Sequence, residues 1–442
     1  MYDLGIVGGK CYLFNSFEEK NVYLLDGKIA AISDQLLQAK EIYQAEGRLV
    51  LPGIIDPHVH FELKGKTVSI DDFYQGSVCA AYGGVTTFID FLDPIRQAKE
   101  FHHKLYTRLK LAEKSVVNYS FHATVAEPEN VKEIVKKLEE FDIRSVKLFT
   151  TYSDSHRRTS SKDILEFLDY SSLGDFIVMV HAEKDELIRL DSDFFVKDLP
   201  LSRPVEAEIR EALELAELVE KSKGRLYMVH VSSGRTIEAL KKKHGEILNA
   251  SMFLESCPHY FCFTEDLYED QKGYLYTLAP PLREAHSQDL LFENYDAIYT
   301  IGTDHCAYRK EDKHKELLSE IPLGIGGIEH SFDIMYHLFK EKAIEKMTIH
   351  PAIMFGLYPQ KGHISVGADA DLMIYNPNIQ QLINKGHSLS DYTPYEGLLV
   401  DGRVESTIVG GRFVLKDLEF LGGKGEYVNG HRSERKQRKI FR

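Results

Sequence analysis

The chain has 442 residues, 43% of them hydrophobic, which is enough for one large domain with an appendage or for two to three ordinary domains. Its 54 Lys and Arg residues against 68 Asp and Glu residues give a net charge of −14, which argues against nucleic acid or an anionic membrane as the main partner. The five cysteines are scattered without CxxC spacing, and no leader or membrane-spanning stretch stands out, so we expect reduced thiols in a cytoplasmic protein.

Short β-like runs separated by turns occupy both ends of the sequence. Near the N-terminus they are YDLGIVGGKCYL, NVYLLDGKIAAI and GRLVLP, and near the C-terminus HISVGADA, DADLMIYNP and STIVGGRFVLKD. The pattern predicts a small β-sandwich made of residues 1–50 together with residues 365–442. We interpret the basic stretch 431–442, HRSERKQRKIFR, as a solvated tail of this domain.

Residues 51–364 instead alternate apolar strands with amphipathic helical stretches such as EAEIREALELAELVEKSK. The strands recur at GIIDPHVHF, TTFIDFL, VNYSFHATV, IRSVKLFTTY, DFIVMVHAE, RLYMVHVSS, SMFLESCPHY and AIYTIGTDH. Eight such βα units over about three hundred residues predict a (β/α)8 TIM barrel, an α/β fold whose strands are buried on both sides.

A polar residue stands at the end of each of the eight predicted strands. These residues are His58 with His60, Asp90, His122, Lys147, His181, His230, His259 and Asp304. Because the active sites of such barrels are built at the carboxyl ends of the strands, we expect the side chains to meet at one mouth. His58 and His60 lie two residues apart, and within a strand they would project from the same face.

The residue types at this mouth predict a metal site. Imidazole nitrogen is a good ligand for Zn²⁺ and similar divalent ions, and the HVH, VHAE and VHVSS motifs supply four imidazoles. Lys147 either pairs with a carboxylate or extends its charge to solvent, or it stays neutral and reacts with carbon dioxide to give a carbamate that bridges two cations. Asp304 either caps the following loop or ligates a metal and accepts a proton from the attacking water.

Further motifs occur in a fixed order along nearly the whole chain. They are PGIIDPHVHF, AAYGGVTTFIDF, VKLFTTY, VHAE, VHVSSG, CPHY, LAPPLRE, GTDHCAY, GIGGIEH, GHISVGADADLMIYNP and DYTPYEG. With these motifs the sequence resembles the hydantoinase/dihydropyrimidinase group of cyclic amidohydrolases, within the amidohydrolase superfamily. The resemblance implies a (β/α)8 barrel with a β-sandwich formed from both termini, and a homodimer or homotetramer.

The resemblance also implies a centre of two divalent metal ions, with zinc as the expected metal. The first ion would be held by His58, His60, carbamylated Lys147 and Asp304, and the second by the same carbamate with His181 and His230. Asp304 would carry a proton during catalysis, and Tyr152 would stabilise the oxyanion. Backbone groups at Ala279 and Leu323 would hold the substrate amide.

The loop after the first predicted strand, FELKGKTVSIDDF, is expected to form part of a lid over the mouth. Its apolar members Phe61, Leu63 and Val68 would contact the substituent of the substrate ring. Glu62 stands where dihydroorotases usually carry an arginine, and a carboxylate facing the pocket would repel an anionic ring. We therefore expect dihydroorotate to be a poor substrate.

The leading hypothesis is a hydrolase that uses two metal ions to open a cyclic amide or ureide, a 5-substituted hydantoin or a dihydropyrimidine, to an N-carbamoyl amino acid. Allantoinase and then dihydroorotase are the alternatives, and His259 in CPHY resembles allantoinase and L-hydantoinase sequences. Asp90, His122 and His259 match no metal ligand, so we interpret them as supporting or pocket groups. A non-catalytic scaffold relative would lose ligands, whereas every predicted ligand position is filled here.

Overall fold

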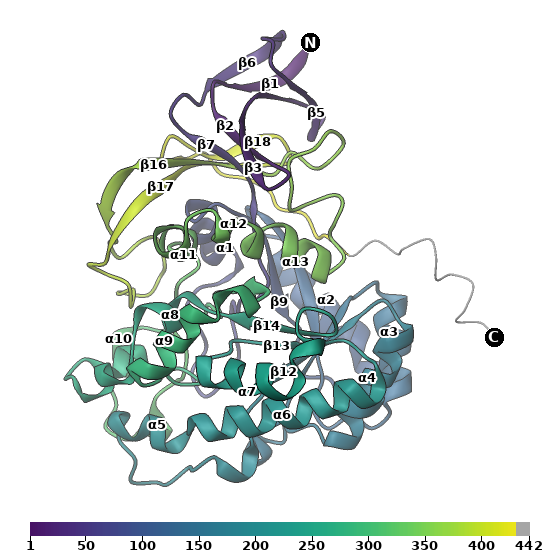
Figure 1. The fold of residues 1–442 in the computed structure, drawn as a ribbon, viewed down its shortest axis with the longest axis vertical. Helices are drawn as coiled ribbons and strands as arrows, with labels where there is room; N and C mark the ends of the chain where they lie inside the picture. The colour runs from purple at the N-terminus through teal and green to yellow at the C-terminus, as the bar shows by residue number, and fades with distance from the viewer. Residues whose placement is uncertain (430–442) are drawn as a thin grey trace.

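The computed structural model describes residues 1–429, and the basic stretch 431–442 lies outside the described residues. It shows a barrel surrounded by helices and, beside one end of the barrel, a layer of β-sheet that contains both the first and the last strands of the chain (Figure 1). Within residues 1–429, no helix combines the length and the apolar character that a membrane crossing requires.

Eight parallel strands form the barrel, in the order β15-β14-β13-β12-β11-β10-β9-β8. They are β8 (Ile54–Asp56), β9 (Val85–Phe91), β10 (Asn118–Thr124), β11 (Ser145–Phe149), β12 (Ile177–His181), β13 (Leu226–Met228), β14 (Met252–Ser256) and β15 (Thr300–Ile301). A parallel bridge between Val59 and His305 brings the first and last strands together, and the Thr303 hydroxyl donates to the Asp56 carboxylate at 2.5 Å. The predicted (β/α)8 fold is therefore confirmed, with a nearly closed barrel.

Helices cover the outside of the barrel between successive strands (Figure 1). They are α1 (Phe73–Tyr82), α2 (Phe101–Ala112), α3 (Val131–Glu140), α4 (Ser161–Leu173), α5 (Leu199–Ser202), α6 (Val205–Ser222), α7 (Gly234–His244), α8 (Pro258–Cys262), α9 (Ala285–Glu293), α10 (Lys310–Lys313), α11 (Ser331–Phe339), α12 (Lys342–Met347) and α13 (Ile349–Met354). Side chains of Asp72, Asn130, Ser160 and Ser233 cap α1, α3, α4 and α7 by accepting main-chain hydrogen bonds. The caps fix where these helices begin.

The remaining strands form two sheets, a four-stranded sheet β5-β4-β1-β6 and a seven-stranded sheet β19-β18-β17-β16-β7-β2-β3. They are β1 (Tyr2–Val7), β2 (Lys10–Leu13), β3 (Ser16–Glu19), β4 (Asn21–Leu25), β5 (Lys28–Ser33), β6 (Ala39–Gln44), β7 (Leu49–Pro52), β16 (Leu372–Leu382), β17 (Leu399–Val409), β18 (Arg412–Lys416) and β19 (Glu419–Phe420). Ile6 and Val22 of the first sheet share one apolar cluster with Val50 and Ile374 of the second.

The two ends of the chain meet in the larger sheet. β7 pairs antiparallel with β16, with Leu51 opposite Met373, so strands coloured purple and yellow-green lie side by side in Figure 1. This confirms the predicted β-sandwich built from both termini. The division at residues 50/51 and 364/365 stays a prediction, and β7 runs across its first boundary.

Candidate active site

His58 and His60 lie beyond the end of β8, which stops at Asp56, so the prediction that strand geometry aligns them is wrong. The loop nevertheless brings both imidazoles to one carboxylate. Nε2 of His58 lies 3.2 Å and Nε2 of His60 3.1 Å from Oδ1 of Asp304. The Asp56 carboxylate holds the loop, because it accepts the main-chain N–H groups of His58 and of Thr303, each at 3.1 Å.

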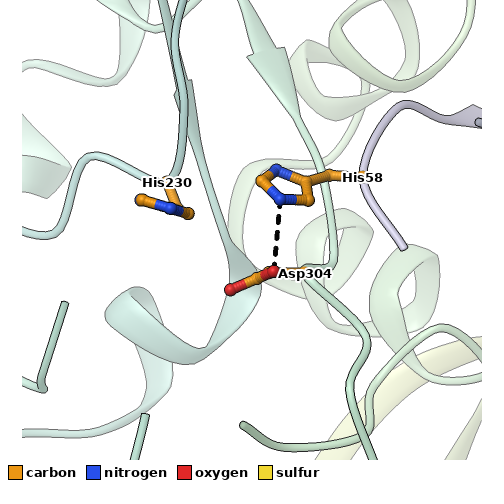
Figure 2. A group of neighbouring side chains, drawn as sticks. All are labelled: His58, His230 and Asp304. Atoms are coloured by element: carbon orange, nitrogen blue, oxygen red, sulfur yellow. Dashed lines mark ion pairs between the residues drawn. The ribbon is translucent and has the colours of Figure 1, made fainter. Parts of the chain in front are cut away.

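Two further residues turn toward the same space. Figure 2 shows His58, His230 and Asp304 facing one another, and their ligand atoms all lie within 4.8 Å of one another. Nδ1 of His181, the last residue of β12, lies 3.0 Å from Nε2 of His230. His230 and Asp304 have left-handed backbone conformations, with φ of 40° and 50°. Such a conformation costs a non-glycine residue about 1–3 kcal/mol and is typical of functional sites.

The charge states of these groups suit a metal ion. Burial lowers the pKa of His60 and of His230, so both imidazoles are neutral near neutral pH. Burial alone would raise the pKa of Asp304, but the imidazoles of His58 and His60 hold it below its ordinary value, so the group is a carboxylate. Within residues 1–429, Nδ1 of His60 and Nδ1 of His230 are buried without a hydrogen-bond partner. Neutral imidazoles around a carboxylate form the donor set that zinc prefers.

All the predicted ligands line a single cavity of about 180 Å³ at the carboxyl ends of the strands. They are His58, His60, Lys147, His181, His230 and Asp304. Tyr152, which the sequence suggests as the oxyanion-stabilising residue, lines the same cavity, as do Leu63, Ala279 and Leu323. The structure therefore brings the predicted ligands together with four of the predicted substrate contacts.

Comparison with known proteins agrees with this geometry. The family model described as the amidohydrolase family matches residues 49–414. The chain belongs to the amidohydrolase family. It is 33% identical to the D-hydantoinase of Geobacillus stearothermophilus and covers 93% of each chain, and 31% identical to that of Streptomyces coelicolor, with 92% of each chain covered. Family membership implies a binuclear metal centre, which the cluster of histidines and Asp304 accommodates.

Solved structures share the whole fold. A crystal structure of D-hydantoinase matches with a TM-score of 0.91 at 30% identity, covering 98% of this chain and 99% of that chain. Dihydropyrimidinase from Brevibacillus agri matches with a TM-score of 0.91 at 28% identity, covering 98% and 100%. L-hydantoinase from Arthrobacter aurescens gives 0.85 at 26%, covering 97% and 100%. These solved structures therefore share the terminal sheets with this chain, in addition to the barrel.

Lys147 is the only lysine among the amidohydrolase ligands predicted here, and its surroundings are unusual for a cation. Its side chain is 2% exposed, and within residues 1–429 its Nζ takes part in no ion pair. Nζ lies 5.6 Å from the centre of the Phe91 ring and 5.4 Å from that of Phe149. Burial lowers the pKa of Lys147 to about 8, which makes its neutral amine accessible near neutral pH.

Two buried glutamates that the sequence analysis missed contact two of the histidines predicted as metal ligands. Glu255 on β14 contacts Nδ1 of His58 at 2.8 Å, and Glu183 contacts Nε2 of His181 at 2.6 Å. Because a carboxylate only accepts hydrogen bonds, Nδ1 of His58 and Nε2 of His181 carry the protons of the neutral imidazoles, and the opposite ring nitrogens keep the lone pairs that a metal ion needs. Arg203 pairs with Glu183 and lies 5.0 Å from the centre of the Tyr152 ring. A glutamate inside the apolar run of β14 was the available sequence signal.

Phe61 and Val68 do not line the cavity of this amidohydrolase, in contrast to the prediction. The Phe61 ring is fully buried, with its centre 4.9 Å from that of Phe88. Val68 is 54% exposed. It lines neither this cavity nor the larger space of about 400 Å³ that adjoins the cavity. The chain turns at Glu62, where φ is 48°, and this turn sends the Phe61 side chain into the core. Glu62 itself pairs with Lys114 at 3.2 Å and does not line the cavity, so the expected repulsion of anions is absent.

The three remaining strand-end residues are buried supports outside the cavity lining. Asp90 pairs with Arg108 at 2.7 Å and accepts the N–H of Phe61. Nε2 of His122 contacts the carbonyl oxygen of Pro57 at 2.8 Å, directly before His58 in the chain. Both ring nitrogens of His259 are buried without a hydrogen-bond partner in the described part of the chain, and burial lowers its pKa to about 4.

Proposed function

We propose that the protein hydrolyses the ring amide of a cyclic amide or ureide, a 5-substituted hydantoin or a dihydropyrimidine, and releases an N-carbamoyl amino acid. The observation that carries the proposal is the strand-end cluster, in which every predicted ligand lines one cavity beside Tyr152. The D-hydantoinase relatives, which match along 93% of the chain, support the same reaction.

In this proposal the cavity holds two zinc ions. His58, His60, Lys147 and Asp304 would hold the first, and Lys147, His181 and His230 the second. The donor set fits these ions, because Nδ1 of His60 and Nδ1 of His230 are buried without a hydrogen-bond partner within residues 1–429, and Asp304 is ionised. Bound divalent ions polarise a carbonyl group and lower the pKa of water.

Lys147 would serve as a carbamate. Its neutral amine nitrogen would form a bond to the carbon of carbon dioxide and release one proton to solvent, which converts the neutral amine into an anionic carbamate. The absence of an ion-pair partner within residues 1–429 and the pKa of about 8 both support this reaction. The negative charge of a carbamate at Lys147 would offset the repulsion between two bound cations.

The protein's own groups carry out the proton transfers. Asp304 accepts a proton as water adds to the ring carbonyl carbon, and it returns this proton to the ring nitrogen as the C–N bond breaks. Burial raises the pKa of Tyr152, so its phenol keeps its proton and donates a hydrogen bond to the oxygen on which negative charge develops. Backbone groups at Ala279 and Leu323 would hold the ring amide, since both residues line the cavity.

Allantoinase activity is the second candidate, and the buried His259 of the CPHY motif favours it. We further propose a homodimer or homotetramer, as implied by the resemblance, which light scattering coupled to size-exclusion chromatography would measure.

A hydrolysis panel tests the function. The metal-replete protein is assayed with dihydrouracil, hydantoin, allantoin and dihydroorotate, and the N-carbamoyl products are identified by mass spectrometry. We expect dihydrouracil and hydantoin to be opened fastest, because no arginine at position 62 binds the dihydroorotate carboxylate. Chelator-treated protein is the control. Failure to open any of the neutral rings would refute the proposed function.

A further inference from the structure

The active-site cavity adjoins an outer chamber of about 400 Å³, and five residues line both spaces. These residues, here called the junction, are Leu63, Lys64, Tyr152, Arg157 and Leu323. If a ring is bound at the proposed metal ligands, a substituent that extends from it toward solvent passes between the junction residues. The junction contains two cations and no carboxylate.

Both junction cations are free of ion pairs. Within residues 1–429, neither Lys64 nor Arg157 has a carboxylate oxygen at ion-pairing distance, whereas the adjacent Arg158 pairs with Asp185 at 3.3 Å and with Glu186 at 2.7 Å. The N–H of Arg157 donates to the carbonyl oxygen of Tyr152 at 3.1 Å. The backbone of Arg157 is therefore held beside the tyrosine proposed to stabilise the oxyanion.

The nearby carboxylates do not neutralise these cations. Asp93 and Asp304 line only the inner cavity, and Asp154, Asp185 and Glu320 line only the outer chamber. Glu183 is already paired with Arg203. A negative group at the junction would thus meet two unpaired donors without facing an acid of the junction itself.

We propose that Lys64 and Arg157 bind a carboxylate that methylene groups separate from the substrate ring, so that the preferred substrates are cyclic amides with an acidic side chain of this length. The inference rests on the proposed ring hydrolysis. The planar guanidinium of Arg157 suits bidentate recognition of a carboxylate, and Lys64 adds a second charge. Leu63 and Leu323 provide apolar surface for the methylene groups between ring and carboxylate.

Two hydantoins of nearly equal shape test the inference, one with a carboxyethyl and one with a carbamoylethyl substituent at the same ring carbon. We expect kcat/KM of the metal-replete protein to be about tenfold higher for the carboxylate, the effect of one charge-assisted hydrogen bond. The preference should weaken as salt concentration rises, because the junction is open to solvent. Equal values for the two compounds would overturn the inference.

Matched variants assign the preference to the junction. Arg157→Gln and Lys64→Gln should each lower the ratio of the two kcat/KM values, mainly through KM of the carboxylate, and the double variant should abolish it. Lys66→Gln is the control, because Lys66 lines only the outer chamber and its Nζ donates to the Ser319 carbonyl oxygen. A preference that survives the double variant, or that Lys66→Gln also removes, would overturn the assignment.

The same assay distinguishes a failure of this inference from a failure of the proposed ring hydrolysis. If the protein opens the carbamoylethyl compound but shows no preference for the carboxylate, the inference fails and ring hydrolysis stands. If it opens neither compound and no ring of the wider panel, the proposed function itself fails.

Discussion

Substitution of Glu255 tests how the proposed metal ligands are oriented. Its Oε1 accepts from Nδ1 of His58 at 2.8 Å and from the main-chain N–H of His230 at 3.1 Å, and its Oε2 accepts from the Tyr227 hydroxyl at 2.6 Å. The side chain is fully buried. One carboxylate thus orients two proposed ligands of different metal ions.

Glu255→Gln removes the charge and keeps the shape. The glutamine oxygen can still accept from His58 and His230, and its NH₂ group can donate to the Tyr227 hydroxyl, which then donates to Thr300 Oγ1, 2.6 Å away. We therefore expect a stable protein whose zinc affinity falls by about 10–100-fold, the usual effect of losing a partner that orients a ligand. Glu255→Ala would additionally leave two buried donors unpaired, at about 1–3 kcal/mol of unfolding free energy each.

Zinc affinity is measured by competition with a chromophoric chelator, and stability by denaturant unfolding of the metal-free protein. Glu211→Gln is the matched control, because Glu211 is a buried glutamate on α6 that does not line the cavity. A zinc affinity of Glu255→Gln equal to that of the unsubstituted protein would refute the role assigned to this carboxylate.

Three further substitutions test metal binding, proton transfer and the pH dependence of stability. Lys147→Ala should lose most bound metal, measured by elemental analysis, because the bridging anion disappears; two retained metal ions with normal turnover would contradict carbamylation. Asp304→Asn should lower kcat by at least about 10²–10⁴-fold, since it removes a proton carrier and a ligand charge, and a smaller loss would move the proton transfer to another group. Burial raises the pKa of Asp333 in α11 to about 8. The unfolded chain therefore releases a proton that the folded chain keeps, and the free energy of unfolding falls as pH rises from about 4 to about 8. Asp333→Asn should remove this fall and stabilise the protein by up to about 4 kcal/mol near pH 7, with no gain near pH 4 in denaturant unfolding.

The barrel, and the set of residues that it brings to one cavity, could be predicted from the sequence because their signals are local. Buried parallel strands read as apolar runs, and the polar residues at five of the eight strand ends line the cavity, whereas Asp90, His122 and His259 do not. His181 illustrates this, since the other residues of its strand are apolar, and Lys147 stands between Val146 and Leu148. The family motifs then supplied the roles.

The direction of side chains in loops could not be predicted in the same way. Phe61 follows His60 in the sequence, yet the left-handed turn at Glu62 sends its ring into the core and lets Glu62 reach Lys114. Glu183 and Glu255 escaped notice because a buried carboxylate is recognised by its partners, and Arg203 and His58 come from other parts of the chain. The junction cations Lys64 and Arg157 likewise meet only through the folded loops.

The pairing of β7 with β16 has a consequence for how the chain is made. Leu51 and Met373 lie about 320 residues apart in sequence, so at roughly 5–20 residues per second the ribosome needs about 20–60 s between them. During this interval the N-terminal strands have open edges, which are templates for pairing with other chains. The barrel between them can form first, because its strands pair with their neighbours in sequence. A fragment that stops before β16 should therefore aggregate through the open edge of β7, although it contains every residue proposed to bind metal.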